Sequence, residues 1–212
     1  MSERRLKIAL TKGRLQDHCV ELFERMGMDC SPVRNPGRRL VHQLPNYPLN
    51  VVLAKAPDVI TYVEHGVCDL GIVGKDTILE QGRSFYEVLD LGFGRCRFAL
   101  AVREGSDFYG TYKTRRVATK YPNVTKHFFD SKGMDVSIIK IEGSVELAPI
   151  LNLSDAIVDI VETGATLREN GLTPIEDAAE VSARLIVNTA SMKLCKEDIL
   201  RFVDGCKRHL EG

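Results

Sequence analysis

The sequence predicts an α/β fold made of two α/β lobes with a cleft between them. Short apolar runs of strand length alternate with amphipathic segments of helix length, which is typical of α/β proteins with mostly parallel strands. This alternation occurs on both sides of a glycine-bearing stretch at 91–97. The chain has 212 residues, which is long enough to bury a sizeable core in each of two small lobes.

The first lobe begins with three strands, each followed by a helix. Proline is tolerated in a first helical turn, so Pro57 opens the second helix. Asp76 is expected to cap the third helix, which ends near Gly82. The expected strands are 6–10, 50–54 and 70–73, and the expected helices are 16–26, 57–65 and 76–82.

The chain is expected to cross into a second lobe near Gly92 and Gly94, because glycines relax a chain where a strand changes sheets. A late strand and a closing helix then return to the first lobe. Lobe I is therefore placed at 1–92 plus 178–212, and lobe II at 93–177. The elements expected after the crossing are strands 98–102, 116–119, 136–141, 156–161 and 182–187, and helices 123–132 and 196–210.

The composition excludes several classes of protein. Lys plus Arg and Asp plus Glu both number 29, so bulk attraction to nucleic acid is not expected, and the absence of Trp leaves few platforms for base stacking. No signal-peptide core or membrane-length apolar run occurs, so a cytoplasmic location is expected. The six cysteines are scattered without a Cys-x-x-Cys pair and are interpreted as reduced thiols. The five histidines show no metal-ligand spacing.

The segment 155–167 carries the strongest chemical signal. An apolar strand runs into Thr163-Gly164-Ala165-Thr166, and a helical turn follows. Such a turn directs backbone N–H groups and two hydroxyls towards one point, which suits a phosphate, and Gly164 permits close approach of the ligand. Asp159 lies upstream, where its carboxylate can accept hydrogen bonds from ribose hydroxyls. The alternative is an ordinary strand–turn–helix in which the threonines only cap the helix.

This segment resembles the phosphoribosyl-pyrophosphate loop of phosphoribosyltransferases. The large common class has two adjacent acids before the turn, whereas this chain has Val158 in the first of these positions and keeps only Asp159. Five segments together are similar to the ATP phosphoribosyltransferase family, which opens histidine biosynthesis. They run in order along nearly the whole chain: Ile8–Leu15, Asp69–Asp76, Ala118–Asn123, Asn152–Asp159 and Glu169–Leu172.

The resemblance implies a fold similar to the type II periplasmic-binding-protein fold. It also implies transfer of a phosphoribosyl group from phosphoribosyl pyrophosphate to N1 of ATP, with release of pyrophosphate. Mg²⁺ is the expected cofactor, held mainly by substrate phosphates rather than by a dedicated set of protein ligands. The chain resembles the short form of the family, which works with a separate regulatory subunit similar to histidyl-tRNA synthetase, so homo- and hetero-oligomers are expected.

The resemblance also implies roles for particular residues. The catalytic residues would be Arg14 and Arg38, with Arg39 as an alternative to Arg38. The expected phosphoribosyl-pyrophosphate ligands are Glu146, Asp155, Asp159, Glu162, Thr163, Gly164, Ala165 and Thr166. The expected ATP ligands are Lys12, Gly13, Arg14, Lys55, Gly71, Asp76, Lys120 and Tyr121.

Most of these residues also have a structural interpretation. Lys12-Gly13-Arg14 follows the first strand, where α/β proteins bind ligands, but without the resemblance it would be a solvated turn. Glu146 can complement a helix dipole, and Tyr121 can pack in the core. Two other functions also remain open: a phosphoribosyltransferase that accepts a free base, and a binding module or sensor for phosphoribosyl metabolites.

Overall fold

The structure is a computed structural model that describes residues 5–82, 84–110 and 113–210. The chain divides into two compact units, of which unit 1 is Met1–Gly94 with Ser182–Gly212 and unit 2 is Arg95–Val181. The sequence places lobe II at 93–177, so the return crossing comes later than expected. The reason is that strand β10 (Leu172–Val181) belongs to the sheet of unit 2 over its whole length.

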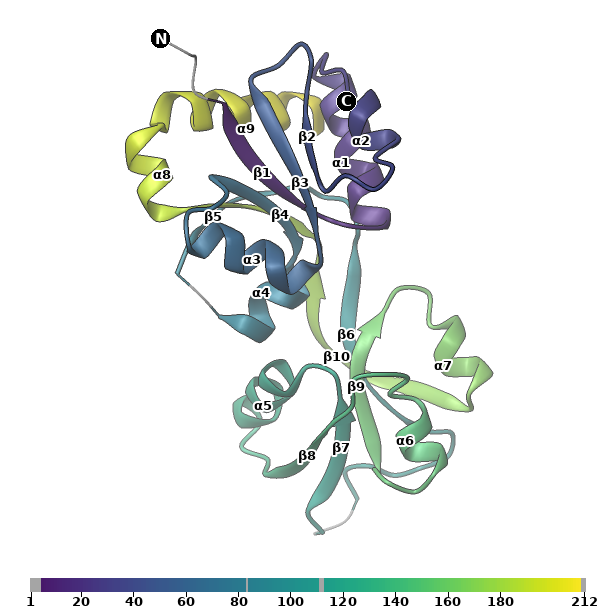
Figure 1. The fold of residues 1–212 in the computed structure, drawn as a ribbon. Coiled ribbons are helices and arrows are strands. Elements are labelled where there is room, and N and C mark those ends of the chain that lie inside the picture. Colours follow the sequence, from purple (N-terminus) through teal and green to yellow (C-terminus); the bar gives the residue numbers. More distant parts are fainter. Residues whose placement is uncertain (1–4, 83, 111–112, 211–212) are drawn as a thin grey trace. The chain divides into compact units, whose positions relative to one another are not determined.

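Unit 1 is built on a mixed sheet with the strand order β2-β3-β1-β4-β11-β5 (Figure 1). The central strand β1 pairs in parallel with β3 and β4, while β2, β11 and β5 pair antiparallel. The strands are β1 (Leu6–Thr11), β2 (Val41–Gln43), β3 (Leu49–Ala54), β4 (Leu70–Gly74), β5 (Tyr86–Asp90) and β11 (Ala183–Val187).

Both faces of this sheet are covered, which explains why β1 is apolar on both sides. Ile8 and Leu10 face one core, where Phe23 of α1 meets Phe202 of α9 edge to face at 5.6 Å. Ala9 faces a second core under α3. The helices are α1 (Arg14–Arg25), α2 (Ser31–Arg34), α3 (Ala56–Glu64), α4 (Lys75–Gln81), α8 (Thr189–Leu194) and α9 (Lys196–Leu210).

Unit 2 has a second mixed sheet with the order β10-β6-β9-β7-β8 (Figure 1). Helix α5 covers one face of this sheet, and α6 and α7 cover the other. The remaining elements are β6 (Cys96–Arg103), β7 (Arg115–Thr119), β8 (Val136–Lys140), β9 (Ala156–Val161), α5 (Pro122–Ser131), α6 (Leu147–Ile150) and α7 (Ala165–Glu169).

Two expectations are wrong. The strands are not mostly parallel, because four of the nine pairings described are parallel and five are antiparallel. The antiparallel pairings include those of β6, β10 and β11, which border the two crossings. Asp76 does not cap α4, since the helix begins at Lys75 after Gly74 and Asp76 lies in its first turn.

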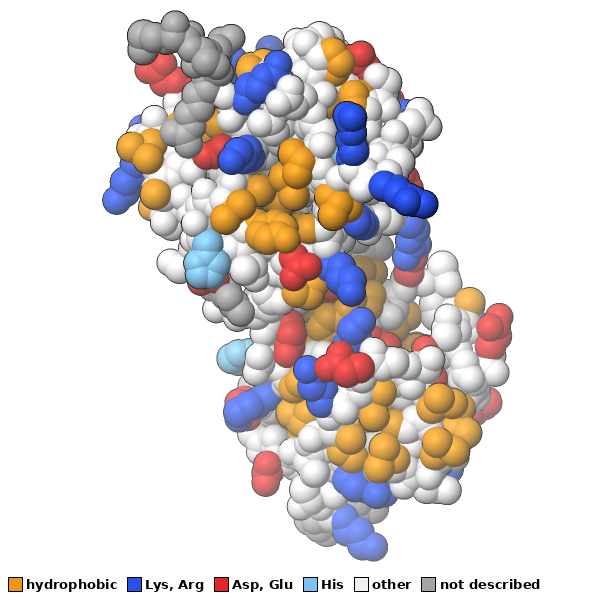
Figure 2. Space-filling model, viewed as in Figure 1, with side chains coloured by type: hydrophobic (Ala, Val, Ile, Leu, Met, Phe, Trp, Pro, Cys, Tyr) orange, Lys and Arg blue, Asp and Glu red, His pale blue; other side chains and the backbone are white. Residues whose placement is uncertain are grey.

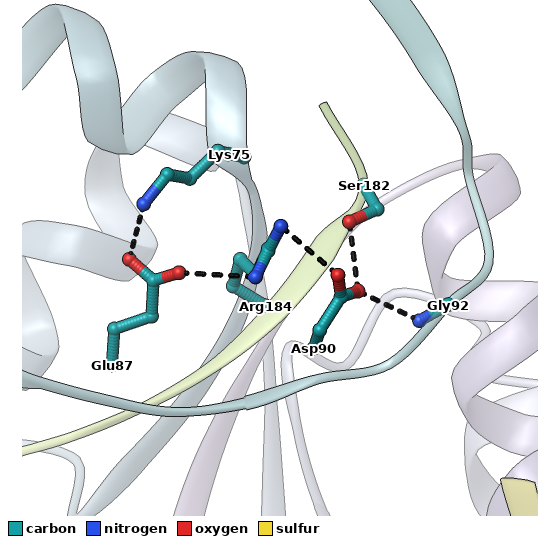
Figure 3. Close-up of polar contacts among 6 residues, drawn as sticks. All are labelled: Lys75, Glu87, Asp90, Gly92, Ser182 and Arg184. Carbon is teal, nitrogen blue, oxygen red and sulfur yellow. Dashed lines mark hydrogen bonds and ion pairs between the residues drawn. The ribbon is translucent and has the colours of Figure 1, made fainter. Parts of the chain in front are cut away.

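Hydrogen bonds and ion pairs connect the two chain segments that border the crossings, near Gly92 and near Ser182, to Asp90 of unit 1. Figure 3 shows that Asp90 accepts hydrogen bonds from Ser182 Oγ at 2.7 Å and from the N–H of Gly92 at 2.9 Å. Arg184 lies 3.0 Å from Asp90 and 3.3 Å from Glu87. Because Gly92 precedes the outgoing crossing and Ser182 follows the return crossing, one carboxylate joins the two segments.

Two further expectations can be compared with the structure. All six cysteines are free thiols, and all except the half-buried Cys96 are buried. No helix in the described part of the chain is long and apolar enough to cross a membrane.

Candidate active site

The carboxyl ends of β1, β3 and β4 share one edge of the sheet in unit 1, because these strands run parallel. The backbone N–H of Lys12 donates to the carbonyl of Ala54 at 2.9 Å, which joins the first two strand ends. The Thr11 hydroxyl donates to the carbonyl of Ile72 at 3.1 Å and so joins the third strand, β4, to the end of β1. This edge brings together Lys12, Gly13, Arg14, Lys55 and Asp76.

Gly13 determines how the first of these loops enters α1. Its φ of 94° and ψ of −149° are rarely adopted by residues with a side chain, so glycine is required. Its carbonyl accepts the first hydrogen bonds of the helix, from Gln16 at 2.8 Å and Asp17 at 3.3 Å. Lys12 and Arg14 on either side are exposed. The loop therefore presents two cations next to the beginning of α1.

Arg38 and Arg39 reach the same edge from another direction. They lie in the loop before β2, which runs antiparallel to β3, so the start of β2 is beside the end of β3. A hydrogen bond of 2.9 Å from the N–H of Leu53 to the carbonyl of Leu40 fixes this arrangement. Both arginines are exposed, and their placement does not distinguish between them.

Gly71 is not at the edge with these residues. It is buried inside β4, and a Cβ atom there would lie 2.7 Å from Val63 and 2.9 Å from Val59 of α3. Close packing of α3 on the sheet explains the glycine. Asp69, in the same sequence segment, directly precedes β4 and so lies at the amino end of that strand, away from this edge. There it accepts hydrogen bonds from the N–H of Lys7 and the hydroxyl of Ser191.

A second edge forms in unit 2, where the parallel strands β7, β8 and β9 end. Lys120 follows β7, the loop at 162–164 follows β9, and Glu146 precedes α6. Lys120 and Glu146 are near enough to Asp159 to influence the pKa of its carboxyl. This edge therefore brings together Lys120, Tyr121, Glu146, Asp159, Glu162, Thr163, Gly164, Ala165 and Thr166.

Gly164 has a left-handed backbone with φ of 74° and ψ of 8°, immediately before α7. The Thr163 hydroxyl accepts from the N–H of Ala165 at 3.3 Å, and Arg168 Nη1 donates to the carbonyl of Thr163 at 3.2 Å. Because the C=O and N–H of one peptide point in opposite directions, Arg168 also orients the N–H of Gly164. Sequence reasoning missed Arg168, although its position four residues after Gly164 on a helix was a usable signal.

Asp159 is a half-buried carboxylate on the sheet face covered by α6 and α7. Burial raises its pKa above the usual value, and the nearby Glu146 raises it further. A hydrogen bond of 2.8 Å from the N–H of Ile160 and the positive charge of Lys120 act in the other direction. The site thus holds two neighbouring acceptor groups in Asp159 and Glu146, which suits a sugar with adjacent hydroxyls.

Comparisons with known proteins identify the family of this chain. A family model described as HisG, ATP phosphoribosyltransferase, matches residues 55–208. An ATP phosphoribosyltransferase of Clostridium kluyveri is 60% identical over 202 residues, which cover 95% of this chain and 92% of that protein. The chain belongs to the ATP phosphoribosyltransferase family. It is therefore a transferase of histidine biosynthesis, as the resemblance implied.

Solved structures agree with the membership in the ATP phosphoribosyltransferase family. The ATP phosphoribosyl transferase (HisG:HisZ) complex from Thermotoga maritima contains a chain that is 32% identical, with a TM-score of 0.81 and coverage of 97% of this chain and 98% of that one. The periplasmic aliphatic sulphonate binding protein SsuA from Escherichia coli is 13% identical with a TM-score of 0.63, covering 99% and 73%. The second likeness shows the fold alone, which is the expected type II periplasmic-binding-protein fold.

The structure explains why this chain has Val158 before Asp159. Val158 is 0% exposed in the core of unit 2, so an acid at this position would be buried without solvent. Its carbonyl accepts from the hydroxyl of Thr119 at 2.7 Å, and that hydroxyl in turn accepts from the N–H of Tyr121 at 2.9 Å. Thr119, which sequence reasoning missed, therefore fixes the turn that carries Lys120. The Tyr121 ring meets a buried phenylalanine edge to face at 4.9 Å.

Asp155 is not brought together with the loop at 162–166. It precedes β9, whose six residues separate it from the loop by about 20 Å. Its carboxylate accepts a hydrogen bond of 2.8 Å from the N–H of Arg116 and lies 3.7 Å from the guanidinium of the same residue. These contacts give Asp155 a structural explanation at the opposite edge of the sheet.

Proposed function

We propose that this chain transfers the phosphoribosyl group of phosphoribosyl pyrophosphate to N1 of ATP. A bond forms between N1 of the adenine and C1 of the ribose while the bond from C1 to pyrophosphate breaks. The products are phosphoribosyl-ATP and pyrophosphate. The observation that carries this proposal is the left-handed Gly164 loop at the end of β9, in a chain of the ATP phosphoribosyltransferase family.

The donor would bind to the edge of unit 2. The loop from Glu162 to Thr166 has the N–H of Gly164 oriented by Arg168, which suits the phosphate of the ribose. Asp159 and Glu146 would accept hydrogen bonds from the ribose hydroxyls. Desolvation favours the neutral form of Asp159 in the free protein, and hydrogen bonds from a bound sugar would favour its charged form.

The cations of unit 1 support the other half of the proposal. As pyrophosphate leaves, negative charge grows on it while the ribose becomes oxocarbenium-like. Arg14 and Arg38 would stabilise that charge, and Lys12, Gly13 and Lys55 would position phosphates of ATP. Asp76 would contribute to the ATP site. Lys120 and Tyr121 of unit 2 would contribute to the nucleotide site. Gly71 and Asp155 are left out of the proposed site, since packing and the contact with Arg116 account for them.

Mg²⁺ would be held mainly by phosphate oxygens of the substrates. Among the described residues no group of three or more His, Cys, Asp or Glu side chains is arranged to hold a metal ion. The neighbouring pair of Glu146 and Asp159 fits a cation that takes few protein ligands and keeps phosphate and water ligands. When bound, the ion would neutralise part of the charge on the leaving pyrophosphate.

A separate regulatory subunit is part of the proposal. The similar chain from Thermotoga maritima is in a HisG:HisZ complex. This chain would act in the same kind of assembly, as a homo-oligomer that also binds a HisZ-type subunit.

Pyrophosphate release tests this function. The chain is incubated with phosphoribosyl pyrophosphate, Mg²⁺ and either ATP or a free base, with and without the HisZ-type subunit of the same genome. The expected result is release of pyrophosphate when ATP is the acceptor but not when a free base is, and loss of that release when Mg²⁺ is chelated. Release with a free base would indicate a base-accepting transferase. Binding of phosphoribosyl pyrophosphate without turnover, even with the subunit, would indicate a binding module.

A further inference from the structure

Thr119, the last residue of β7, makes hydrogen bonds to both neighbouring strand segments at the edge of unit 2. Its carbonyl accepts from the N–H of Ile141, which directly follows β8, at 2.9 Å. Its hydroxyl donates to the carbonyl of Val158 in β9 at 2.7 Å and accepts from the N–H of Tyr121 at 2.9 Å. Figure 1 shows β7 between β8 and β9. One residue therefore connects the end of β7 with β8, β9 and the turn at 120–121.

The Thr119 hydroxyl acts where the backbone pairing of β7 with β9 stops. The register of these two strands ends at the pair of Thr119 and Val158. The hydroxyl adds one more hydrogen bond to β9 and also holds the peptide between Lys120 and Tyr121. Thr119 is buried, and buried groups that lose a hydrogen-bond partner are costly. The turn at 120–121 is therefore attached to β9 through this hydroxyl.

Thr119 itself is out of reach of a substrate. Figure 2 shows acidic and basic side chains mixed on the surface that it views, whereas Thr119 lies beneath the surface of unit 2 with an exposed fraction of 0%. Lys120, the next residue, is exposed. Burial raises the pKa of the Asp159 carboxyl in β9, and the positive charge of Lys120 opposes that rise. An effect of Thr119 on the reaction would therefore pass through the turn that carries Lys120.

Strand β9 is held in the sheet independently of Thr119. It pairs with β6 along its whole length, from Ala156 to Val161. The far side of the turn is also anchored, because the carbonyl of Tyr121 accepts the first hydrogen bond of α5, from the N–H of Thr125 at 3.0 Å. Between these anchors, the Thr119 hydroxyl sets how closely the turn approaches β9. Loss of the hydroxyl should therefore displace Lys120 and leave Asp159 in place.

We propose that Thr119 is a positioning residue for the acceptor nucleotide, and that it acts by holding Lys120 against β9. The inference rests on the proposed function, in which Lys120 and Tyr121 contribute to the nucleotide site while Asp159 binds the ribose of the donor. A displaced turn should weaken the binding of ATP more than that of phosphoribosyl pyrophosphate, because Asp159 and the phosphate loop belong to β9 and the residues after it. If Thr119 only stabilised the fold, a folded variant would show no such difference between the substrates.

The test compares two buried threonines of unit 2 in the full-length chain. Thr119→Val keeps a similar shape but can form neither hydrogen bond of the hydroxyl, whereas Thr119→Ser can form both. Thr125→Val is the control, because Thr125 is also 0% exposed and its hydroxyl has no hydrogen-bond partner within the described part of the chain. Affinities for ATP and for phosphoribosyl pyrophosphate are measured by calorimetry. Circular dichroism and thermal unfolding verify that each variant is folded at the temperature used.

Thr119→Val should bind ATP about tenfold more weakly, with an affinity for phosphoribosyl pyrophosphate within about threefold of the wild type. In steady-state assays the KM for ATP should rise by a similar factor. Thr119→Ser and Thr125→Val should bind both substrates like the wild type. Normal affinity for ATP in folded Thr119→Val, or an equal loss for the two substrates, overturns the proposal.

A double-mutant cycle tests whether Thr119 acts through Lys120. Lys120→Ala alone should weaken the binding of ATP, and the addition of Thr119→Val should then cost less than about threefold, since the displaced side chain is already absent. A further tenfold loss in the double variant would show that Thr119 does not act through Lys120. If the wild-type chain binds both substrates but forms no phosphoribosyl-ATP, the proposed reaction is wrong, while the affinities of Thr119→Val still decide whether Thr119 positions Lys120.

Discussion

Two glycines with left-handed backbones border α7, and only one of them lies in the phosphate loop. Gly164 precedes the helix with φ of 74°, and Gly171 follows it with φ of 65°. A Cβ atom at Gly164 would lie 3.1 Å from the Arg168 guanidinium, whereas at Gly171 it would meet nothing within 4 Å. Substitution at either glycine therefore introduces the same backbone strain, but only substitution at Gly164 also disturbs the phosphate loop.

Gly164→Ala should lower kcat/KM for phosphoribosyl pyrophosphate by about 10- to 100-fold, because the loop and its contact with Arg168 must shift. Both variants should lose about 1–2 kcal/mol in free energy of unfolding, because alanine is strained in the left-handed conformation. Gly171→Ala, however, should keep nearly normal kinetics. Steady-state assays and urea unfolding of both variants provide the measurement. Equal kinetic losses in the two variants would mean that strain, rather than the loop, explains the effect.

Asp159 should make the unliganded protein less stable at neutral pH. Burial raises its pKa in the folded state, so the folded state binds more protons than the unfolded state between the two pKa values. Stability therefore falls as pH rises through that interval and stays lower above it. Asn has no charge, and its side-chain oxygen can still accept the N–H of Ile160. Asp159→Asn should thus raise the free energy of unfolding at pH 7 by about 1 kcal/mol.

Urea unfolding at pH 7 and again below about pH 3.9, the usual pKa of Asp, tests this sign. The advantage of Asp159→Asn should disappear at the lower pH, where the wild-type carboxyl is protonated. The same variant should bind phosphoribosyl pyrophosphate more weakly. If Asp159→Asn is less stable than the wild type at pH 7, the raised pKa of Asp159 in the folded protein is contradicted.

The arginines of unit 1 can be distinguished by kinetics where geometry leaves two of them equivalent. Arg14→Ala and Arg38→Ala should each slow turnover by roughly 10²–10³, the scale for losing one group that stabilises charge. Arg39→Ala, in the same exposed loop, is the matched comparison. A large loss of turnover in Arg39→Ala with normal turnover in Arg38→Ala would mean that Arg39, rather than Arg38, stabilises the leaving pyrophosphate. Unchanged turnover in Arg14→Ala and Arg38→Ala would remove both from the mechanism.

At the scale of elements, sequence reasoning worked where a segment is buried and regular. The expected strand at 156–161 and helix at 196–210 coincide with β9 and α9, because their apolar periodicity is unbroken. Strand β10 was missed, since it alternates exposed and half-buried residues and contains Pro174. The same limit applies to single residues. The sequence shows that Gly71 is a glycine, but only packing shows that α3 requires it.

Asp90 joins elements that are far apart in the sequence, so its loss should affect stability more than its exposure suggests. Asp90→Ala removes the acceptor of Ser182 Oγ and of the Gly92 N–H, and leaves Arg184 with one carboxylate fewer. The variant should lose about 1–2 kcal/mol in urea unfolding. Asp177→Ala, which removes the partner of Arg97 in a more exposed pair, should lose less than about 1 kcal/mol. Equal losses would show that the Asp90 contacts do not act together.

At the scale of the whole molecule, the two sheets repeat one design. In each unit most of the candidate residues lie near the carboxyl ends of parallel strands, and both crossings border that same edge of the sheet. The beginning of β11 pairs with the end of β4, and the end of β10 pairs with the beginning of β6. The sequence predicted two α/β units but not this mixture of directions, because strand pairing depends on contacts between distant segments.

The proposed reaction joins a phosphoribosyl group to ATP. Mass spectrometry of the nucleotide formed from ATP and phosphoribosyl pyrophosphate, with Mg²⁺ and the HisZ-type subunit present, tests it most directly. We expect a product with the mass of ATP plus one phosphoribosyl group, formed in step with pyrophosphate release and about 10- to 100-fold more slowly with Gly164→Ala at low phosphoribosyl pyrophosphate. Recovery of unchanged ATP, with phosphoribosyl pyrophosphate bound but intact, would contradict it.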